Sequence, residues 1–238
     1  HIVEPGLQEA MDQAMATGRL HFTAKPEPAD VFIIAVQTPH RDTPEGKRVS
    51  DMKYVESAAR SVGQVIRPGG LCVLESTSPP YSTRLVESIV SEVSGIPAED
   101  FMTAHCPERI IPGRMLIELR ENDRIIGSNR PESAEYAKEI YTPVVTKGTI
   151  RTTDDLTAEM CKLTENTFRD INIAYANELS KVCDRLGIDV FNLIKLANCH
   201  PRVNVHTPGV GVGGHCIAVD PWFIHEKFED ITPLIYEA

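Results

Sequence analysis

Short apolar runs alternate with helical stretches throughout the first 150 residues of the chain. In the segment 30–36, Asp30 is followed by a continuous run of apolar residues, which is typical of a strand buried on both faces. Helical and strand patterns then alternate along the chain, at 54–65, 71–77, 82–93, 101–109, 123–127, 131–140 and 144–146. This order predicts an α/β fold with a partial doubly wound, Rossmann-like parallel sheet over residues 1–150.

Polar residues follow the predicted strands at the points where the strands end. Thr38, Thr77 and the pair Glu108-Arg109 all stand in such loops. Because ligands of open α/β sheets collect outside the carboxyl ends of the strands, we expect a binding site there.

The second half of the chain has a helical pattern. Residues 152–155, Thr-Thr-Asp-Asp, offer N-cap candidates for a long helix that continues to Leu186, where Gly187 supplies the stop. A shorter helix is expected at about 190–197. We therefore predict a central all-helical domain over residues 151–238, whose long helix bridges two domains or packs against a partner subunit.

Composition excludes several classes of protein. A net charge of −10 and a pI near 5.3 argue against a nucleic-acid-binding protein, which needs a basic surface. The sequence has no apolar run of about 18 residues and no signal-peptide pattern at its start, so we predict a cytoplasmic location without a membrane partner.

Six cysteines are scattered along the chain without CxxC spacing, which indicates reduced thiols rather than disulfides. Three of them stand next to a histidine, at 105–106, 199–200 and 215–216. Structural zinc sites usually use spaced pairs of ligands, so no metal site is predicted.

Lys162, Asn166 and Arg169 follow each other at i, i+4 and i+7 in the predicted long helix, which places them on one face. A solvated helix face is the simpler interpretation. Flanking apolar residues indicate instead that the helix is well covered, and a covered lysine needs a partner or a chemical role.

A glycine-rich loop at 209–214 leads to Cys216, and Asp220 follows four residues later. A thiol on such a turn, with a carboxylate close by, suits nucleophilic catalysis once the pKa of the thiol is lowered. The alternative from this segment alone is a structural cysteine buried under a loop.

Five motifs occur in one order along the chain: Glu-Ser-Thr-Ser-Pro at 75–79, Cys-Pro-Glu-Arg at 106–109, Ala-Glu-Met-Cys-Lys-Leu-Thr-Glu-Asn at 158–166, His-Pro-Arg-Val-Asn at 200–204 and Gly-Val-Gly-Gly-His-Cys-Ile-Ala-Val-Asp-Pro at 211–221. Together they resemble the UDP-glucose/GDP-mannose dehydrogenase family, and within it the branch that acts on UDP-N-acetyl-D-mannosamine. Members also carry an N-terminal GxGxxG turn and a C-terminal nucleotide-binding domain. We therefore expect a fragment truncated at both ends, with 1–150 as the later part of the NAD-binding domain.

The resemblance implies NAD as cofactor and a four-electron oxidation of the C6 alcohol of a UDP-sugar to a carboxylate. It implies that Cys216 is the nucleophile and that Lys162 and Asn166 stabilise tetrahedral intermediates. Either Glu108 or Asp220 would activate water. It places NAD at Thr38 and Thr77. The substrate contacts that it implies are Arg109, Ile110, Lys162, Asn166, Arg169, His200, Arg202 and Gly213.

Other interpretations remain open. Another UDP-sugar 6-dehydrogenase, acting on UDP-glucose or UDP-N-acetylglucosamine, would share these motifs. An ordinary two-electron hydroxyacid or sugar-phosphate dehydrogenase would use the Lys and Asn without a cysteine nucleophile. A non-catalytic assembly module would use the long helix only for dimerisation. For the enzyme, we expect a homodimer or higher homo-oligomer formed through the long helix.

Overall fold

The computed structural model describes residues 4–212 and 216–238, which form two compact units. The first unit comprises the residues up to Thr38 together with Met52–Thr77 and Tyr81–Glu159. The second comprises Pro39–Asp51, Ser78–Pro80 and the residues from Met160 onward.

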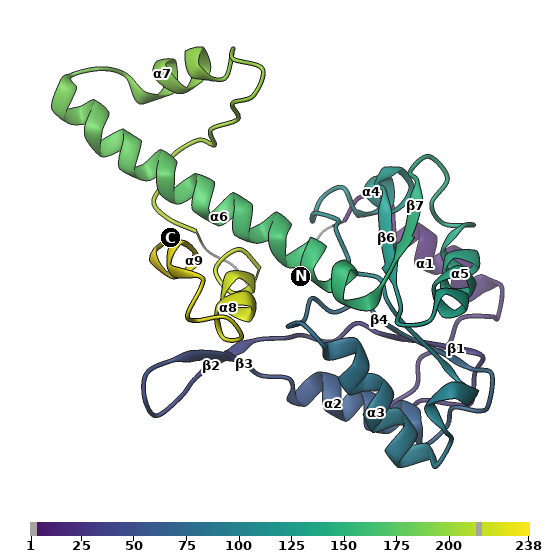
Figure 1. Ribbon diagram of the computed structural model, residues 1–238. Helices are drawn as coiled ribbons and strands as arrows, with labels where there is room; N and C mark the ends of the chain where they lie inside the picture. Colours follow the sequence, from purple (N-terminus) through teal and green to yellow (C-terminus); the bar gives the residue numbers. More distant parts are fainter. Residues whose placement is uncertain (1–3, 213–215) are drawn as a thin grey trace. The chain divides into compact units, whose positions relative to one another are not determined.

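A five-stranded sheet forms the centre of the first unit (Figure 1). Its strands lie in the order β1 (Val31–Ile34), β4 (Leu71–Leu74), β5 (Met102–His105), β6 (Arg124–Gly127) and β7 (Ile150–Thr153). β1, β4 and β5 run parallel, β6 pairs antiparallel with β5 through His105 and Gly127, and β7 is parallel to β6. The α/β fold is confirmed, but the sheet is mixed.

The expectation of a parallel sheet was wrong for β6, which pairs antiparallel with β5 after the short helix α4 (Met115–Glu121). A buried strand reads as an apolar run in either direction, so the sequence pattern does not record how it pairs. The predicted run at 144–146 is also not a strand. The amides of Val144 and Val145 both donate to the carbonyl of Tyr141, which closes the end of a helix, and the strand forms later, at β7.

Helices cover strand β4 on both faces. Cys72 and Leu74 pack in a cluster with residues of α2 (Lys53–Gly63) and α3 (Ser82–Ser94). Leu71 and Val73 pack in a second cluster with α5 (Pro131–Tyr141). The remaining helices of this unit are α1 (Leu7–Ala16) and the single 3-10 turn Ala98–Asp100. Burial on both faces explains why this strand reads as a continuous apolar run.

Gly127, at the end of β6, supports a close approach of two backbones. A Cβ atom built there would collide with the carbonyl of Asp154 and lie 2.5 Å from the Cβ of Ala158. We expect Gly127→Ala to lower the free energy of unfolding by about 1–3 kcal/mol, the usual effect of overpacking. Urea unfolding would measure this. Gly209→Ala, where a Cβ has open space, is the control, and equal losses in the two variants would contradict the explanation.

The described residues of the second unit form helices, a hairpin and connecting loops. α6 (Asp155–Leu186) begins in the first unit and continues through the second. It is followed by α7 (Val190–Ala197), α8 (Asp220–His225) and α9 (Pro233–Glu237). The long helix and α7 confirm the sequence prediction, and the side chain of Asp189 caps α7 by accepting from the amide of Phe191 at 2.9 Å. In the part of the chain that the structure describes, no helix combines the length and apolar character needed to span a membrane.

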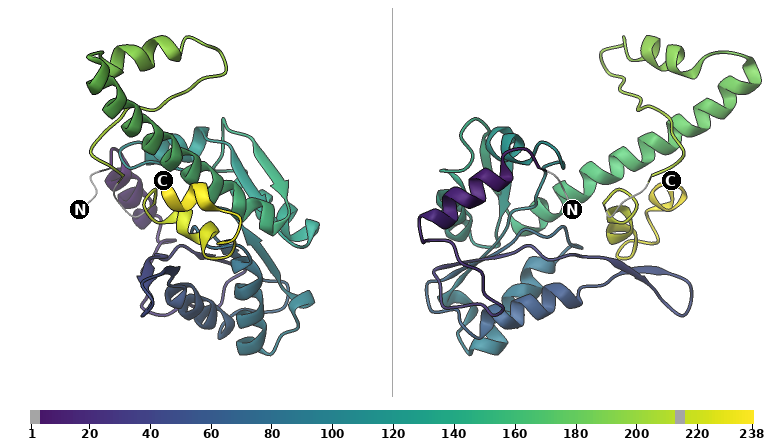
Figure 2. Two further views of the ribbon diagram at one scale, coloured as in Figure 1. Left: turned by 60° about the vertical axis from the view of Figure 1, so that its left-hand side comes forward. Right: turned by 180° about the vertical axis from the view of Figure 1, so that it is seen from behind.

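The hairpin, β2 (His40–Asp42) and β3 (Arg48–Ser50), lies beside α8 (Figures 1 and 2). The carboxylate of Glu226 accepts from the amide of Ser50 at 2.7 Å and from its hydroxyl at 2.8 Å. Lys47 forms an ion pair with Glu229. Periodicity did not reveal these three-residue strands because they are polar and partly exposed, and the glutamates that hold the hairpin are more than 170 residues away.

Candidate active site

Lys162, Asn166 and Asp220 come together in the second unit. Asn166 lies one turn after Lys162 on α6, and Asp220 is the first residue of α8. The Nδ2 amide of Asn166 donates to Oδ2 of Asp220 at 2.5 Å, and both residues are almost completely buried, with exposed fractions of 4% and 3%. Lys162 is half-buried, and its charge acts on Asp220. The structure therefore groups an ammonium, an amide and a carboxylate.

Apolar packing between α6 and the α8 region buries this group. Leu163, Val219 and Phe223 share one cluster, to which Met160 and Ile235 add further cover. Burial raises the pKa of Asp220 to about 6, against the opposing effects of the Asn166 hydrogen bond and the Lys162 charge. A carboxyl group with this pKa can exchange a proton near neutral pH.

The raised pKa of Asp220 makes protein stability depend on pH. The folded state binds the proton of Asp220 more tightly than the unfolded state, so stability is greater at low pH and falls as pH rises through the window from 3.8 to about 6. Relative to Asp220→Asn, the free energy of unfolding of the wild type should fall by about 3 kcal/mol across this window. Urea unfolding of both proteins at a series of pH values measures it, and a difference that stays constant with pH would contradict the assignment.

Cys216 is exposed and lies one tight turn before Asp220. Its carbonyl accepts from the amide of Val219 at 3.0 Å and from that of Asp220 at 2.8 Å. The backbone therefore links the predicted nucleophile directly to the residue that pairs with Asn166. Gly213, a predicted substrate contact, lies outside the described residues.

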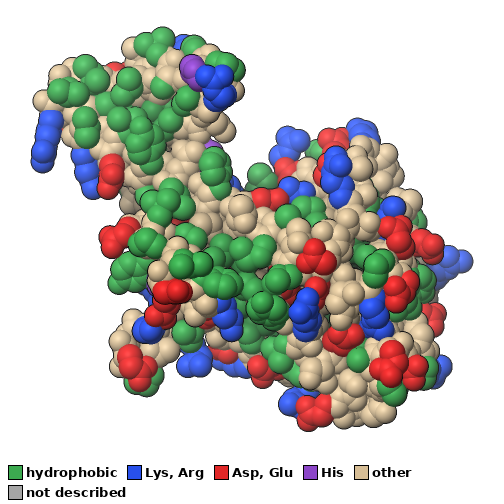
Figure 3. All heavy atoms as spheres, viewed as in Figure 1, with side chains coloured by type: hydrophobic (Ala, Val, Ile, Leu, Met, Phe, Trp, Pro, Cys, Tyr) green, Lys and Arg blue, Asp and Glu red, His purple; other side chains and the backbone are tan. Residues whose placement is uncertain are grey.

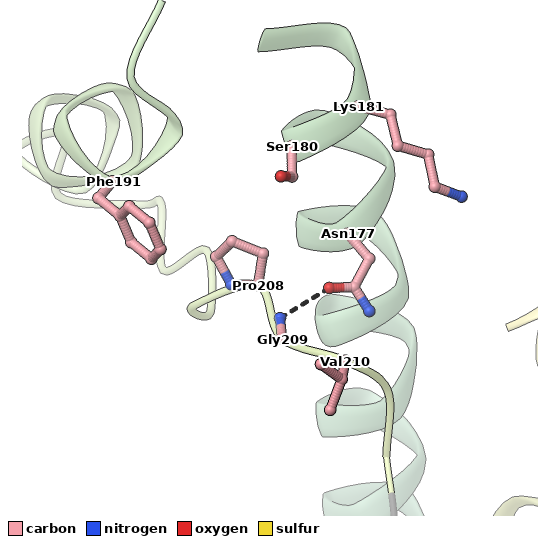
Figure 4. Close-up of a pocket in the computed structure, with 7 residues that line it drawn as sticks. All are labelled: Asn177, Ser180, Lys181, Phe191, Pro208, Gly209 and Val210. Atoms are coloured by element: carbon pink, nitrogen blue, oxygen red, sulfur yellow. Dashed lines mark hydrogen bonds between the residues drawn. The ribbon is translucent and has the colours of Figure 1, made fainter. Parts of the chain in front are cut away.

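The first residue of the glycine-rich loop, Gly209, is hydrogen-bonded to α6. Asn177 accepts from the amide of Gly209 through Oδ1 at 2.8 Å, and Figure 4 shows this contact beside a pocket of about 440 Å³. The pocket is lined by Asn177, Ser180, Lys181, Phe191, Pro208, Gly209 and Val210. Sequence reasoning did not find this attachment, because a single Asn on a helix carries no signal of its partner.

Arg169, His200 and Arg202 are exposed, unlike Asn166 and Asp220. The ring Nε2 of His200 lies 3.4 Å from Nη2 of Arg202. Their segment is tied to α6 at Asn172, which accepts from the amide of His206 at 2.8 Å. Asn172 is six residues beyond Asn166, about 9 Å along the helix axis. The structure thus groups His200 and Arg202 with the middle of α6, and Arg169 has its own exposed position on that helix.

Thr38 and Thr77 meet at the carboxyl ends of the neighbouring parallel strands β1 and β4. The hydroxyl of Thr38 donates to the carbonyl of Thr77 at 2.6 Å, and both residues are half-buried. This is the edge of a doubly wound sheet at which dinucleotides bind. The two residues therefore fit the position predicted for NAD.

Glu108, Arg109 and Ile110 follow β5 in the first unit. Oε1 of Glu108 accepts from the amides of Arg109 at 2.7 Å and Ile110 at 3.1 Å, and Oε2 accepts from Arg124 at 2.9 Å. Nη1 of Arg109 donates to the carbonyl of Asp123 at 2.8 Å. Sequence reasoning missed Arg124, although an arginine at the start of an apolar strand run was a usable signal. Among residues 4–212 and 216–238, no group of three or more His, Cys, Asp or Glu side chains is placed to hold a metal ion.

Comparison with known proteins identifies related sequences over the whole chain. Residues 1–145 match the NAD binding domain of the UDP-glucose/GDP-mannose dehydrogenase family, which confirms the prediction of NAD as cofactor, and residues 156–236 match its central domain. An NDP-N-acetyl-D-galactosaminuronic acid dehydrogenase of Ralstonia nicotianae is 49% identical over 100% of this chain and 57% of its own. A UDP-N-acetyl-D-mannosamine dehydrogenase of Yersinia pestis is 47% identical with the same coverage. The chain thus spans somewhat more than half the length of these curated relatives.

Solved structures agree with the sequence comparison. A UDP-D-ManNAc dehydrogenase from Pyrococcus horikoshii superposes with a TM-score of 0.92 at 41% identity, covering 99% of this chain and 56% of that one. A UDP-glucose dehydrogenase from Pyrobaculum islandicum reaches 0.84 at 32% identity, covering 99% and 55%. The motifs, the two matched domains and these structures show that the chain belongs to the UDP-glucose/GDP-mannose dehydrogenase family.

Proposed function

We propose that this chain carries the catalytic centre of an NAD-dependent UDP-sugar 6-dehydrogenase that oxidises the C6 alcohol of UDP-N-acetyl-D-mannosamine to the acid. The observation that carries the proposal is the buried Asn166–Asp220 pair, close to Lys162 and one turn from Cys216. Family membership supports the reaction class, and the names of the relatives support an N-acetylhexosamine substrate.

In the proposed reaction, Thr38 and Thr77 would help to hold NAD, which would supply the hydride acceptor, with one NAD molecule for each of the two hydrides that leave the sugar carbon. Lys162 takes the proton of the C6 hydroxyl as a neutral amine while the alcohol becomes an aldehyde, and it thereby becomes the ammonium of the next step. The thiolate of Cys216 then adds to the aldehyde carbon, and Lys162 with Asn166 stabilises the resulting oxyanion of the thiohemiacetal. Loss of the second hydride converts this adduct to a thioester, and water cleaves it to release the acid and the Cys216 thiol.

We assign the activation of water to Asp220 rather than Glu108. A pKa of about 6 lets Asp220 accept a proton from water and return it near neutral pH. Both oxygens of Glu108 are already occupied by hydrogen bonds, two from backbone amides and one from Arg124. Glu108 is therefore better suited to hold its loop than to move protons.

The other predicted contacts keep their proposed roles. Cationic side chains suit a diphosphate or a hydroxylated sugar, which supports Arg109, Arg169 and Arg202 as substrate contacts. Ile110, His200 and Gly213 are proposed with them on the basis of the family motifs. The division at residue 150 and the cytoplasmic location likewise remain proposals.

The identity of the hexosamine is the second open choice. The relatives include an NDP-N-acetyl-D-galactosaminuronic acid dehydrogenase at 49% identity, which favours a galacto-configured alternative about as strongly as the manno-configured one. In this family, enzymes that act on UDP-glucose usually carry a lysine just before the aspartate of the cysteine loop. Val219 occupies that position here, which supports an N-acetylhexosamine over UDP-glucose.

A panel of UDP-sugars, tested on a full-length enzyme that carries this chain, decides among these substrates. We expect the greatest turnover with UDP-N-acetyl-D-mannosamine and two NADH formed for each sugar consumed. One NADH per sugar would identify a two-electron dehydrogenase, and no turnover with any UDP-sugar would contradict the proposed function.

We also propose that the enzyme is a homodimer or higher homo-oligomer formed through α6 and α7. Leu186, Phe191 and Leu196 have exposed fractions of 67%, 60% and 61%. Figure 3 shows apolar side chains gathered over α7 and the end of α6 that adjoins it. Exposed apolar side chains gathered in this way are typical of a protein interface.

Charges introduced on this surface should break the oligomer. We expect Phe191→Asp combined with Leu196→Asp to convert the protein to monomers, because an unpaired buried carboxylate strongly disfavours association. Analytical ultracentrifugation measures the mass. Phe22→Asp, which alters a 73% exposed residue of the first unit, should leave the mass unchanged. An unaltered oligomer in the double variant would exclude this surface.

A further inference from the structure

A buried ionic cluster lies at the carboxyl ends of β4 and β5 and consists of Glu75, Cys106, Glu108, Arg124 and Tyr141. The antiparallel pairing of His105 with Gly127 explains why it forms. Glu108 comes three residues after His105, and Arg124 comes three residues before Gly127. In an antiparallel pair these two positions lie opposite each other. Arg124 has an exposed fraction of only 4%.

The other four members of this cluster all approach the guanidinium of Arg124. Nη2 donates to Oε2 of Glu108 at 2.9 Å, and Nη1 lies 3.7 Å from Oε1 of Glu75. Nη1 is also 3.6 Å from Sγ of Cys106. The guanidinium centre stands 5.0 Å from the ring centroid of Tyr141. The guanidinium thus interacts with two carboxylates at once, which its several N–H donors, arranged as a fork in one plane, allow and a lysine ammonium does not reproduce.

Tyr141 completes the cluster from α5. Its hydroxyl donates to Oε1 of Glu75 at 2.6 Å, so Glu75 is held between Tyr141 and Arg124. Burial raises the pKa of Glu75, assisted by the charge of Glu108, while Tyr141 and Arg124 oppose the shift. Such a cluster is expensive to bury compared with apolar residues of similar size. The presence of such a cluster therefore suggests a role beyond filling the core.

The cluster controls the segment that follows β5. Glu108 is the only member with a substantially exposed side chain, at 33%, and it holds the amides of Arg109 and Ile110 through its second oxygen. A chain of contacts therefore runs from Tyr141 and Glu75 through Arg124 to Glu108, and on to the backbone of residues 109–110. Without Arg124, the Glu108 carboxylate could turn towards water and release those amides.

We propose that Arg124 is a positioning residue, which locks Glu108 and thereby holds the Arg109–Ile110 segment in the conformation that receives the UDP-sugar. The inference rests on the proposed function for its kinetic consequence. The contacts that carry it lie wholly within the first unit.

Arg124→Lys tests the proposal in the full-length enzyme, because it keeps the charge and removes the fork. We expect kcat/KM for the UDP-sugar to fall by about 100-fold, as for a substrate misplaced by about 1 Å. The Kd of NAD should stay the same. Arg130→Lys is the matched control, since Arg130 is another arginine of this unit that pairs with a glutamate, Glu87, at 2.8 Å. We expect its kcat/KM to change by less than about threefold, within the range of an unspecific loss of stability.

A double-mutant cycle separates positioning from mere stabilisation. If Arg124 acts through Glu108, the Arg124→Lys/Glu108→Gln variant will be no slower than Glu108→Gln alone. Losses that multiply would overturn the proposal. If Arg124→Lys does not fold, Tyr141→Phe removes a single hydroxyl from the same chain of contacts and should lower kcat/KM in the same direction.

Hydrogen exchange supplies a readout that does not depend on turnover. The amides of Arg109 and Ile110 should exchange at least about tenfold faster in Arg124→Lys than in the wild type or Arg130→Lys. Unchanged exchange would overturn the proposal even if activity fell. A wild type that oxidises no UDP-sugar would instead contradict the proposed function, and the exchange of these two amides would still test the role of Arg124.

Discussion

Cys216→Ser is expected to reduce formation of the sugar acid by roughly 10⁴-fold or more, because removal of a covalent nucleophile eliminates the thioester path. A serine hydroxyl is a far weaker nucleophile at neutral pH than a thiolate. NAD binding should remain nearly intact, since Thr38 and Thr77 lie in the first unit at the ends of β1 and β4. Chromatographic measurement of the acid and a fluorescence titration with NAD would test both expectations.

Cys199→Ser is the matched control for this experiment. Cys199 is also exposed and also stands beside a histidine, but it lies in the turn after α7 rather than before Asp220. We expect it to retain the activity of the wild type. Undiminished acid formation in Cys216→Ser would remove the nucleophile assignment.

Lys162→Met is expected to lower kcat by about 10²–10³-fold, the usual effect of deleting one group that stabilises a developing oxyanion. The methylene stem keeps its apolar packing while the charge is lost. Because the Lys162 charge lowers the pKa of Asp220, the same change should raise that pKa further and move the acidic limb of the pH–rate profile to higher pH. Steady-state kinetics across pH would measure both effects.

Lys181→Met tests whether any lysine of α6 would give the same result. Lys181 is exposed and lines the pocket beside Asn177, Phe191 and Gly209, nineteen positions further along the helix. It should leave kcat and the pH profile unchanged. A similar loss in both variants would mean that the effect of Lys162→Met comes from the helix as a whole.

Local patterns predicted those elements that carry their own signal. The buried strand β4 is a continuous apolar run, and the helices α6 and α7 have helical apolar patterns with a cap or stop residue. The hairpin at 39–51 was not visible, since it is held by Glu226 and Glu229, which directly follow α8 and are distant in sequence. The direction of β6 was missed for the same reason, because strand pairing is a long-range choice that periodicity does not record.

The candidate site divides in a similar way. The i, i+4 spacing predicted Lys162 and Asn166 on one face of a helix, and family motifs named Asp220, but no spacing indicated that Asn166 would be buried against Asp220. That contact arises from packing of Leu163 with Val219 and Phe223. Arg124 was overlooked because its role depends on register between two antiparallel strands.

The central claim is that Cys216 carries the sugar as a thioester, and the intact mass of the Asp220→Asn enzyme after incubation with NAD and UDP-N-acetyl-D-mannosamine tests it most directly. Without Asp220 to activate water, hydrolysis should become the slow step, so the acyl form should accumulate. We predict a mass increase equal to the sugar-nucleotide acyl group, located on the peptide that contains Cys216, with two NADH released per site. Continued production of acid with Cys216 unmodified, or an adduct on a different residue, would contradict the account.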